Sequence, residues 1–368
     1  MGELILDGHK LAWHRERVEA WARGERVAPI LIDCALTQKC TYKCVYCYAT
    51  LQENEAMPIS KEAFFAFQDD AAEIGVKAMS FVSDGESTCC PFVNDAIIHG
   101  KQVGLDMAMG TNGLLLDHAR LPEALEALTY LRFNVSAADR SRYMEIHGVS
   151  GKCYDQVMEN VRACVRIKRE RGLKVTLGLQ MVLMPAFADQ IVPMAKLGKE
   201  LGVDYTVIKH CSDDEAGRLG VDYSKYFDLH DLLREAETHS TADYLVKAKW
   251  SKIIAGRKRC YSKCYGPPLM LQMSGTGLVA PCGSFFNDQR YTKYHIGNIT
   301  KTRFKDIWQS GRYWEVMDLI RSDQFDPRTM CGTLCLQHKV NEALWSMKEE
   351  GAVLPHPVGD PPEHLNFI

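Results

Sequence analysis

The chain has 368 residues, of which 46% are hydrophobic and 25% charged, and its formal net charge is −3. This composition is typical of a globular protein with a large core, and the length fits two domains or one barrel with an extension. The net charge provides no basic field for a polynucleotide, so we expect no nucleic-acid partner. Because there is no run of about 18 apolar residues and no signal-peptide pattern, we expect a cytoplasmic protein with no membrane partner.

Short β-rich runs alternate with amphipathic helical patterns in the first part of the chain. The predicted strands are 30–36, 77–82, 105–110, 130–136, 174–183 and 204–209, and the predicted helices are 60–74, 92–102, 118–128, 152–171 and 188–201. Six such repeats predict an α/β fold, a parallel sheet curled into a partial (β/α)6 barrel. In such folds the reacting groups gather at the carboxyl ends of the strands.

The repeating pattern stops after about residue 215, and this divides the chain. We expect an N-terminal extension over 1–28, the barrel over 29–215, a helical linker over 216–259, a small domain over 260–345 and a proline-rich tail over 346–368. Residues 265–282 predict a hairpin with "SGTG" as its turn. The tail is predicted to be extended, because proline cannot continue a helix.

Fourteen cysteines without a signal peptide favour metal or redox chemistry over a disulfide scaffold. In "CTYKCVYCY", Cys40, Cys44 and Cys47 are spaced C-x3-C-x2-C, on a loop just past the first predicted strand. A zinc ribbon would need a second cysteine pair about 15 to 20 residues later, and none follows. Three thiolates instead suit a cubane iron–sulfur cluster that keeps one iron open for a second molecule.

This cysteine loop, with its aromatic residue Tyr46, resembles the cluster loop of radical S-adenosylmethionine (radical SAM) enzymes. The resemblance covers roughly residues 28–212 and implies a [4Fe-4S] cluster that binds SAM. In "SDGEST" the resemblance implies that Gly85 and Glu86 hold the amino group of SAM, although Asp84 replaces the usual first glycine. It also implies SAM contacts from Thr111 and Asn112 of "GTNG", from Ser136, and from Gln180 or Val182 beside the adenine. For Gln180 and Val182, plain strand packing is the alternative.

A second resemblance lies nearer the C-terminus. Gly277 follows Cys264 after twelve residues, and Cys282 follows Gly277 after four. This spacing resembles the opening of the SPASM and twitch extensions of radical SAM enzymes, and "YHIGNITKTRFKDIW" is similar to the stretch that follows that opening. Only Cys331 and Cys335 come later, so the resemblance implies the shorter twitch form with one auxiliary [4Fe-4S] cluster. A zinc site is the alternative, and Cys260 could replace one ligand. His338 and Asn341 could orient this second cluster.

The resemblance implies an oxidoreductase that takes electrons from a flavodoxin- or ferredoxin-like donor. The reduced first cluster cleaves SAM, and the resulting 5′-deoxyadenosyl radical abstracts hydrogen from a small-molecule substrate. Only about 28 residues precede the first strand, too few for a peptide-recognition domain, so a sugar, aminocyclitol or nucleotide-linked sugar is favoured. We expect oxidation of an alcohol to a ketone, because a closed auxiliary cluster gives the substrate's electron an acceptor. Epimerisation, dehydration, peptide or protein modification, and a non-catalytic iron–sulfur sensor are the alternatives.

Two residues at the end of the sixth strand are catalytic candidates. Lys209 could hold a substrate hydroxyl or carboxylate, or it could be a solvated lysine. Cys211 could donate a hydrogen atom to a substrate radical, or it could be a small buried residue. Asp213, Asp214 and Glu215 follow and could serve as a base, although a run of charges is usually a solvated loop.

Overall fold

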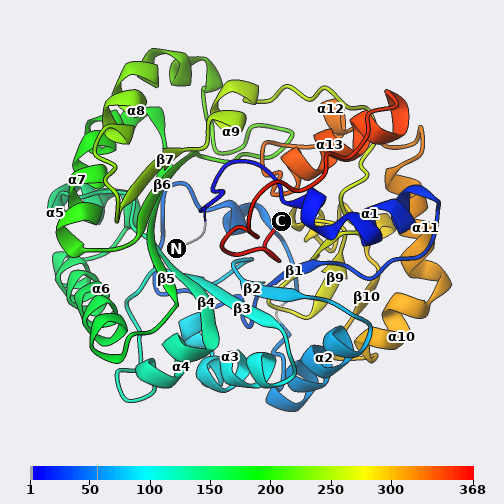
Figure 1. Ribbon diagram of the computed structural model, residues 1–368, viewed down its shortest axis with the longest axis horizontal. Coiled ribbons are helices and arrows are strands. Elements are labelled where there is room, and N and C mark those ends of the chain that lie inside the picture. Colours follow the sequence, from blue (N-terminus) through cyan, green and yellow to red (C-terminus); the bar gives the residue numbers. More distant parts are fainter. Residues whose placement is uncertain (1–2, 56) are drawn as a thin grey trace.

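A single sheet of ten strands organises the computed structural model, which describes residues 3–55 and 57–368. The strand order is β10-β9-β8-β1-β2-β3-β4-β5-β6-β7, and the strands from β8 through β7 are parallel to their neighbours. Their bounds are β1 Leu31–Cys34, β2 Ala78–Phe81, β3 Asp106–Thr111, β4 Leu128–Asn134, β5 Thr176–Leu183, β6 Tyr205–His210, β7 Leu245–Ala248, β8 Met270–Met273, β9 Leu278–Ala280 and β10 Gly297–Asn298. The six predicted strands are confirmed as β1 to β6, and Figure 1 shows the sheet curled into a partial barrel, whose inward-turned side is called the bore below.

Helices cover the outer face of the curled sheet (Figure 1). The predicted helices are confirmed as α2 Lys61–Glu73, α3 Val93–Gln102, α4 Leu121–Ala127, α6 Gly151–Arg171 and α7 Ile191–Leu201, while the short helix α5 Arg140–His147 was not predicted. Alternate strand residues such as Leu131, Leu179 and Ile208 are fully buried in the core that these helices share with the sheet. Because successive strand side chains point to opposite faces, the residues between them face the bore.

The segment predicted as a helical linker contains a strand, so that prediction is partly wrong. Helix α8 His230–Glu237 and helix α9 Trp250–Ala255 flank β7, which pairs with β6 in parallel. The strand forms because β6 would otherwise present an unpaired edge, and a free edge is a template for another strand. The barrel therefore extends past residue 215, to at least Ala248.

The C-terminal part continues the same sheet. Strand β8 pairs with β1 in parallel, and β9 turns back antiparallel to β8, which confirms the predicted hairpin. The helices that follow are α10 Phe304–Gln309, α11 Gly311–Ile320, α12 Pro327–Met330 and α13 His338–Glu349. Both cysteine-rich regions are thus attached to one continuous sheet.

The two chain ends meet inside the ring of strands (Figure 1). Phe367 packs with Leu31, Ala78 and Met270, which are the first residues of β1, β2 and β8. The Lys10 ammonium donates a 2.5 Å hydrogen bond to the carbonyl of Phe367. The tail contains no helix after α13, as predicted, and together with the N-terminal segment, which leads into α1 Arg15–Ala22, it closes the bore at the amino ends of the strands.

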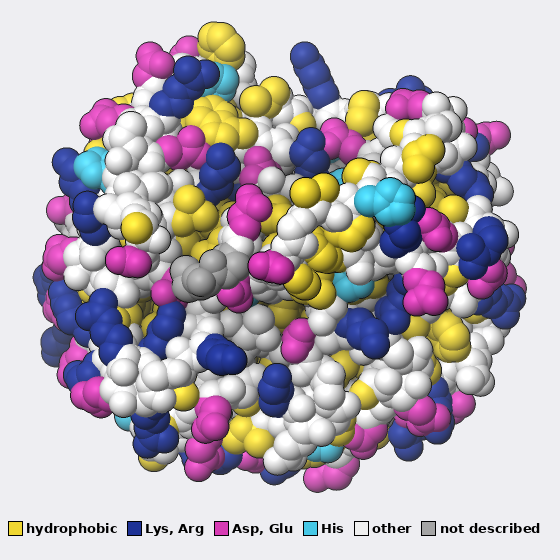
Figure 2. Space-filling view, viewed as in Figure 1, with side chains coloured by type: hydrophobic (Ala, Val, Ile, Leu, Met, Phe, Trp, Pro, Cys, Tyr) yellow, Lys and Arg dark blue, Asp and Glu magenta, His cyan; other side chains and the backbone are white. Residues whose placement is uncertain are grey.

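The exposed face around these chain ends carries acidic and basic side chains interspersed, as Figure 2 shows. This distribution agrees with the small net charge. None of the helices in the described part of the chain is long and apolar enough to cross a membrane.

Candidate active site

The loop that follows β1 brings the three predicted cluster cysteines together. Cys44 interacts electrostatically with both Cys40 and Cys47, and burial together with these neighbours raises the pKa of Cys44 to about 12. Thiols must lose their protons to bind iron, and a cluster with positive charge at this position would offset the free-energy cost of deprotonating them. The three thiols therefore fit an iron–sulfur cluster held at the carboxyl end of the first strand.

Two glycines allow neighbouring segments to approach Thr37, at the start of this loop, closely. Gly85 has a φ of +73°, and a Cβ there would lie 2.0 Å from the carbonyl oxygen of Thr37. A Cβ on Gly275, in the turn between β8 and β9, would lie 2.4 Å from the carbonyl carbon of the same residue. Asp84 joins the two sides, because its Oδ1 accepts a 2.8 Å hydrogen bond from the Gly275 amide. The predicted SAM loop, the cluster loop and the C-terminal hairpin are therefore locked to one another.

The Glu86 carboxylate is buried and accepts four hydrogen bonds. Oε1 accepts from the amide (3.0 Å) and hydroxyl (2.8 Å) of Thr88 and from the Thr111 hydroxyl (2.7 Å), and Oε2 accepts from the Asn112 amide (2.6 Å). Glu86, Thr111 and Asn112, predicted separately, therefore form one cluster at the ends of β2 and β3. A carboxylate held in place in this way is a chemically suitable acceptor for an ammonium ligand.

Tyr46, Ser136 and Val182 also meet. The Ser136 hydroxyl donates a 3.1 Å hydrogen bond to the Tyr46 hydroxyl and accepts one of 3.1 Å from the Val182 amide. Gln180 lies two residues earlier on β5, where its amide donates a 2.9 Å hydrogen bond to the Asn134 side chain. The cluster loop is thus tied to the ends of β4 and β5, and Gln180 is hydrogen-bonded to the side chain of a neighbouring strand residue on the inward-turned face of the sheet.

His147 is a site residue that the sequence analysis missed. It is fully buried at the end of α5, and its Nδ1 lies 3.2 Å from the Cys44 sulfur. Its Nε2 accepts a 3.3 Å hydrogen bond from the Ser136 amide. Burial lowers the pKa of His147 to about 3, so the ring is neutral. Because Nε2 is the acceptor, Nδ1 carries the proton and donates it toward the cysteine sulfur.

The four C-terminal cysteines line a single cavity. Cys264, Cys282, Cys331 and Cys335 all border it, together with side chains that include Phe285 and Asn341. Burial, followed by repulsion from the other thiols, raises the pKa values of Cys264 and Cys331 well above the ordinary value. Four convergent thiols with no disulfide among them fit the four corners of a second iron–sulfur cluster.

The alternative of a zinc ion at either site is not supported. Over residues 3–55 and 57–368, no group of three or more His, Cys, Asp or Glu side chains is arranged to hold a single metal ion. A zinc ion would draw four sulfurs to about 2.3 Å from one point. Cys260 is exposed and lies 3.6 Å from the Glu342 carboxylate, and it does not border the cavity.

His338 and Asn341 are placed to orient the second thiol set. Asn341 accepts hydrogen bonds from the amides of Tyr265 (2.5 Å) and Gly266 (3.0 Å), which fixes the segment that carries Cys264. His338 bonds to the Tyr261 hydroxyl at 2.9 Å, and that hydroxyl lies 3.7 Å from the Cys335 sulfur. Asn341 borders the cavity itself, whereas His338 contacts it through Tyr261.

The catalytic candidates lie at the carboxyl end of β6, with Lys209 in the strand and Cys211 directly after it. Cys211 is fully buried, and burial raises its pKa to about 12, with a smaller influence from Cys47 of the first set. Lys209 is half-buried, and burial lowers its pKa well below the ordinary value.

The acidic run after Cys211 is structural. The Asp213 carboxylate accepts hydrogen bonds from the amides of Asp214 (2.8 Å) and Leu219 (2.9 Å), and its own amide donates to the Thr333 hydroxyl at 2.7 Å. Asp214 is ion-paired with Arg218. Asp213 and Asp214 are buried and not solvated. The sequence left open a catalytic base or a solvated loop, and the structure instead shows a segment that connects β6 to the Cys331–Cys335 segment.

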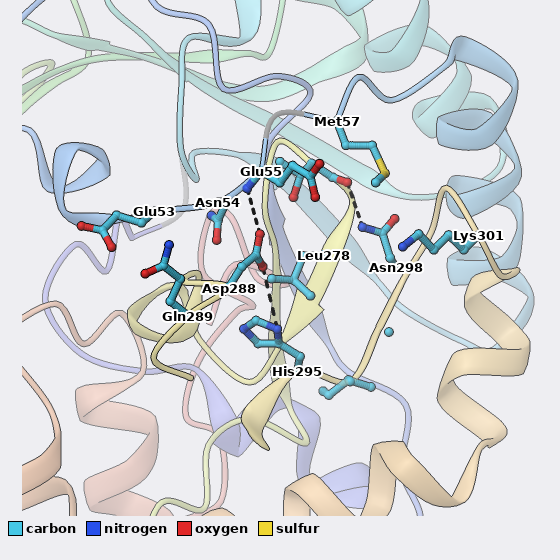
Figure 3. Close-up of a pocket in the computed structure, with 13 residues that line it drawn as sticks. Glu53, Asn54, Glu55, Met57, Leu278, Asp288, Gln289, His295, Asn298 and Lys301 are labelled. Carbon is cyan, nitrogen blue, oxygen red and sulfur yellow. Dashed lines mark hydrogen bonds and ion pairs between the residues drawn. The ribbon is translucent and has the colours of Figure 1, made fainter. Parts of the chain in front are cut away.

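A separate groove of about 760 Å³ lies between residues 53–55 and Met57 on one side and the segment around β9 and β10 on the other. Figure 3 shows Glu53 and Glu55 from the first segment and Asp288, His295 and Lys301 from the second, with Asp288 beside His295. The Glu55 amide donates a 2.8 Å hydrogen bond to Asp288. None of the cysteines of either set borders the groove, so it lies apart from the site of chemistry.

Comparison with known proteins agrees with this geometry. The family model described as the radical SAM superfamily matches residues 35–197, and the model described as an iron–sulfur cluster-binding domain, SPASM, matches residues 264–335. These ranges contain the first thiol set and all four cysteines of the second.

Relatives by sequence have different stated activities. A tungsten-containing aldehyde ferredoxin oxidoreductase cofactor-modifying protein of Pyrococcus furiosus is 22% identical over 76% of this chain and 80% of its own. A probable GTP 3′,8-cyclase of Saccharolobus solfataricus is 26% identical over 63% of this chain and 69% of its own. An Fe-coproporphyrin III synthase of Methanosarcina barkeri is 24% identical over 74% of this chain and 72% of its own.

Solved structures share the fold. SuiB of Streptococcus suis, bound to S-adenosylmethionine, gives a TM-score of 0.64 at 16% identity over 85% of this chain and 72% of its own. The protein anSMEcpe with bound AdoMet gives 0.56 at 14% identity over 88% and 97%.

Proposed function

We propose that this protein, which combines a radical SAM domain with a SPASM iron–sulfur cluster-binding domain, oxidises an alcohol of a small sugar-like or aminocyclitol-like substrate to a ketone. Its cofactors are SAM and two [4Fe-4S] clusters, one on each thiol set. When bound and reduced, the first cluster and SAM supply a 5′-deoxyadenosyl radical that removes a hydrogen atom from substrate. A flavodoxin- or ferredoxin-like protein is the proposed source of the electron.

The observation that carries the oxidation is the closed second thiol set. All four cysteines border one cavity, so they could together supply one thiolate to each iron of a [4Fe-4S] cluster. A cluster held in this way would exchange electrons and would offer no site for substrate coordination. Oxidation of an alcohol by hydrogen abstraction leaves one further electron to remove, and such a cluster would supply an acceptor for it.

The chain's own residues provide binding and orientation. The Glu86 carboxylate, which accepts hydrogen bonds from Thr111 and Asn112, would receive the SAM ammonium. Lys209 and Cys211 face the bore from β6, where Lys209 would hold a polar group of the substrate. The ends of the chain close the bore on the other side, which favours a small molecule and keeps water from the reacting carbon.

A peptide or protein substrate is the second candidate. The open groove beside β9 and β10 favours it, because β10 is the last strand of the sheet and an extended peptide can pair with such an edge. The groove borders neither thiol set, so the peptide would need to reach the bore from there.

The test uses reconstituted holoenzyme, SAM, a reductant and deuterated candidate substrates. Transfer of deuterium into 5′-deoxyadenosine identifies the substrate and the attacked carbon. In deuterated water, a dehydrogenase makes a ketone with no solvent deuterium at that carbon. A product with the substrate's composition and one solvent deuterium would refute oxidation and assign epimerisation.

The replacement Cys211→Ala further distinguishes oxidation from epimerisation. A dehydrogenase keeps making ketone without this thiol, whereas an epimerase that uses it loses turnover. Deuterium incorporation only from a labelled peptide would favour the second candidate substrate.

A further inference from the structure

One cation borders the cavity that the four C-terminal cysteines line. Arg259 lies in its wall, and the other described side chains there, such as Phe285, Gln272 and Gln337, are apolar or neutral. Among the described residues that line the cavity, Arg259 is therefore the only one with a formal charge, apart from the cysteines once they ionise. A charge beside such a cavity is screened less than a charge on the open surface.

Hydrogen bonds to the main chain hold the Arg259 guanidinium in this position. Its Nη1 donates to the carbonyls of Gly256 (3.3 Å) and Lys258 (2.9 Å), which directly follow α9. Its Nη2 donates to the carbonyl of Gly332 at 3.0 Å, and Gly332 is the residue after Cys331. The guanidinium thus connects the end of α9 to the segment that carries two of the four cysteines.

The charge of Arg259 is not neutralised by a carboxylate. Over residues 3–55 and 57–368, the hydrogen bonds of its guanidinium all go to main-chain carbonyls, and no ion pair joins it to an aspartate or glutamate. A carbonyl is a dipole without net charge, so the cation keeps its full charge beside the cavity. An arginine does not lose its proton in a protein, so this charge is independent of pH.

The thiols of the cavity respond to this cation. Burial, followed by repulsion from the other three thiols, raises the pKa of Cys331, and Arg259 acts in the opposite direction. A [4Fe-4S] cluster with four cysteine ligands has a net negative charge, which grows by one unit on reduction. A nearby cation attracts the more negative form more strongly, so it favours the reduced cluster.

We propose that Arg259 raises the reduction potential of the auxiliary cluster and so makes it a better acceptor for the electron that substrate oxidation releases. Arg259 acts through the cluster and not on the substrate. The carbon radical left by hydrogen abstraction becomes a ketone by losing its hydroxyl proton to solvent and one electron to this cluster. An oxidised flavodoxin- or ferredoxin-like protein then takes the electron from the cluster. This inference rests on the proposed function, in which the auxiliary cluster is the acceptor.

The test is a redox titration of the reconstituted protein, followed by electron paramagnetic resonance with SAM added to identify the first cluster. In Arg259→Met, the equilibrium constant for reduction of the auxiliary cluster should fall roughly tenfold, a shift of about 59 mV to more negative potentials. We expect no larger effect, because Arg259 is half-buried and solvent screens part of its charge. The potential of the first cluster should not change.

Two matched variants separate charge from structure. Arg259→Lys keeps the positive charge but loses the planar fork of donors, and its equilibrium constant should stay within a factor of about two of the wild type. Arg257→Met removes an exposed arginine that donates to the carbonyls of Asp214 and Glu215 and does not border the cavity, so it should change neither potential. No shift in Arg259→Met, or an equal shift in either control, would overturn the proposal.

Iron analysis verifies that each variant keeps both clusters. If Arg259→Met loses the second cluster, Arg259→Gln takes its place in the titration, because a glutamine amide is neutral and can still donate to a carbonyl. Loss of the second cluster in both neutral variants would overturn the proposal and assign Arg259 to the assembly of the cluster.

Product analysis of the wild-type protein separates this inference from the proposed function. Ketone formation by the wild type, without a shift of the potential in Arg259→Met, refutes only the role of Arg259. A shift of the potential, without a ketone from any tested alcohol, refutes the proposed oxidation and leaves the effect of Arg259 on the potential standing.

Discussion

Replacing His147 with phenylalanine tests whether this buried ring tunes the first cluster. Phenylalanine preserves the packing of the ring against Tyr42, Tyr46 and Tyr143. It removes the Nδ1 donor that lies 3.2 Å from the Cys44 sulfur and the Nε2 acceptor of the Ser136 amide. A hydrogen bond to a cysteine ligand favours the reduced state of a cluster, which carries more negative charge.

The expected effect is a more negative reduction potential. A hydrogen bond to a charged group contributes about 1.5–3 kcal/mol, and only the part that differs between the oxidised and reduced states changes the potential. If that part is about 1 kcal/mol, the potential falls by roughly 40 mV, since about 59 mV corresponds to a tenfold change for one electron. The auxiliary cluster, which has no contact with His147, should keep its potential.

The measurement is a redox titration of the reconstituted protein, followed by electron paramagnetic resonance with and without SAM to distinguish the two clusters. His147→Asn is the matched control, because its amide nitrogen can take the place of Nδ1 and should keep the potential near that of the wild type. A His147→Phe potential within about 10 mV of the wild type, or a shift to more positive values, would show that the histidine does not tune the cluster.

Three further predictions concern the clusters, SAM binding and the buried cations. The protein should contain about eight irons. Replacing Cys40, Cys44 and Cys47 together by alanine should abolish SAM cleavage but keep about half the iron, because the other four thiols border a separate cavity. If iron and sulfide analysis found about four irons in the wild type, this would argue against a second cluster. Glu86→Ala should weaken SAM binding roughly ten- to hundredfold while leaving the first cluster in place, as measured by equilibrium binding, and an unchanged affinity would contradict the assigned role. Lys249→Met should raise the thermal midpoint of ligand-free protein. Burial lowers the pKa of this lysine from 10.5 to about 7, so the folded state disfavours its proton. The stability gained by the substitution should therefore be largest below about pH 7 and should shrink as the pH rises toward 10.5. An equal gain at pH 7 and pH 9.5 would mean that the lysine is not buried as a charge.

Local patterns in the sequence predicted much of the fold. The six strands of the barrel could be located because each is a short β-rich run between amphipathic helices, and the hairpin because of its "SGTG" turn. Strand β7 was missed because its four residues gain stability only by pairing with the edge of β6, a contact that no local pattern carries.

The candidate site, too, could be predicted only where local sequence patterns indicate it. Spacing selected Cys40, Cys44 and Cys47, because iron–sulfur chemistry requires thiolates and the spacing of a ligand loop is local. The family resemblance implied the four C-terminal cysteines, and it implied Glu86 and Asn112 individually but not the hydrogen bond that joins them. The sequence separates Cys44 from His147 by 103 residues, and nothing in either segment indicates their contact.

The sequence by itself therefore indicated the type of chemistry and the candidate ligands of the two clusters. Only the tertiary structure decided what surrounds them. Lys209 and Lys249 look like surface residues in the sequence, because a lysine carries no local sign of which face of the sheet it will occupy. Curling of the sheet and pairing of β7 with β6 bring these charges near Arg132. Repulsion and burial depend on distances across the fold, so they exist only once the chain has closed around the bore.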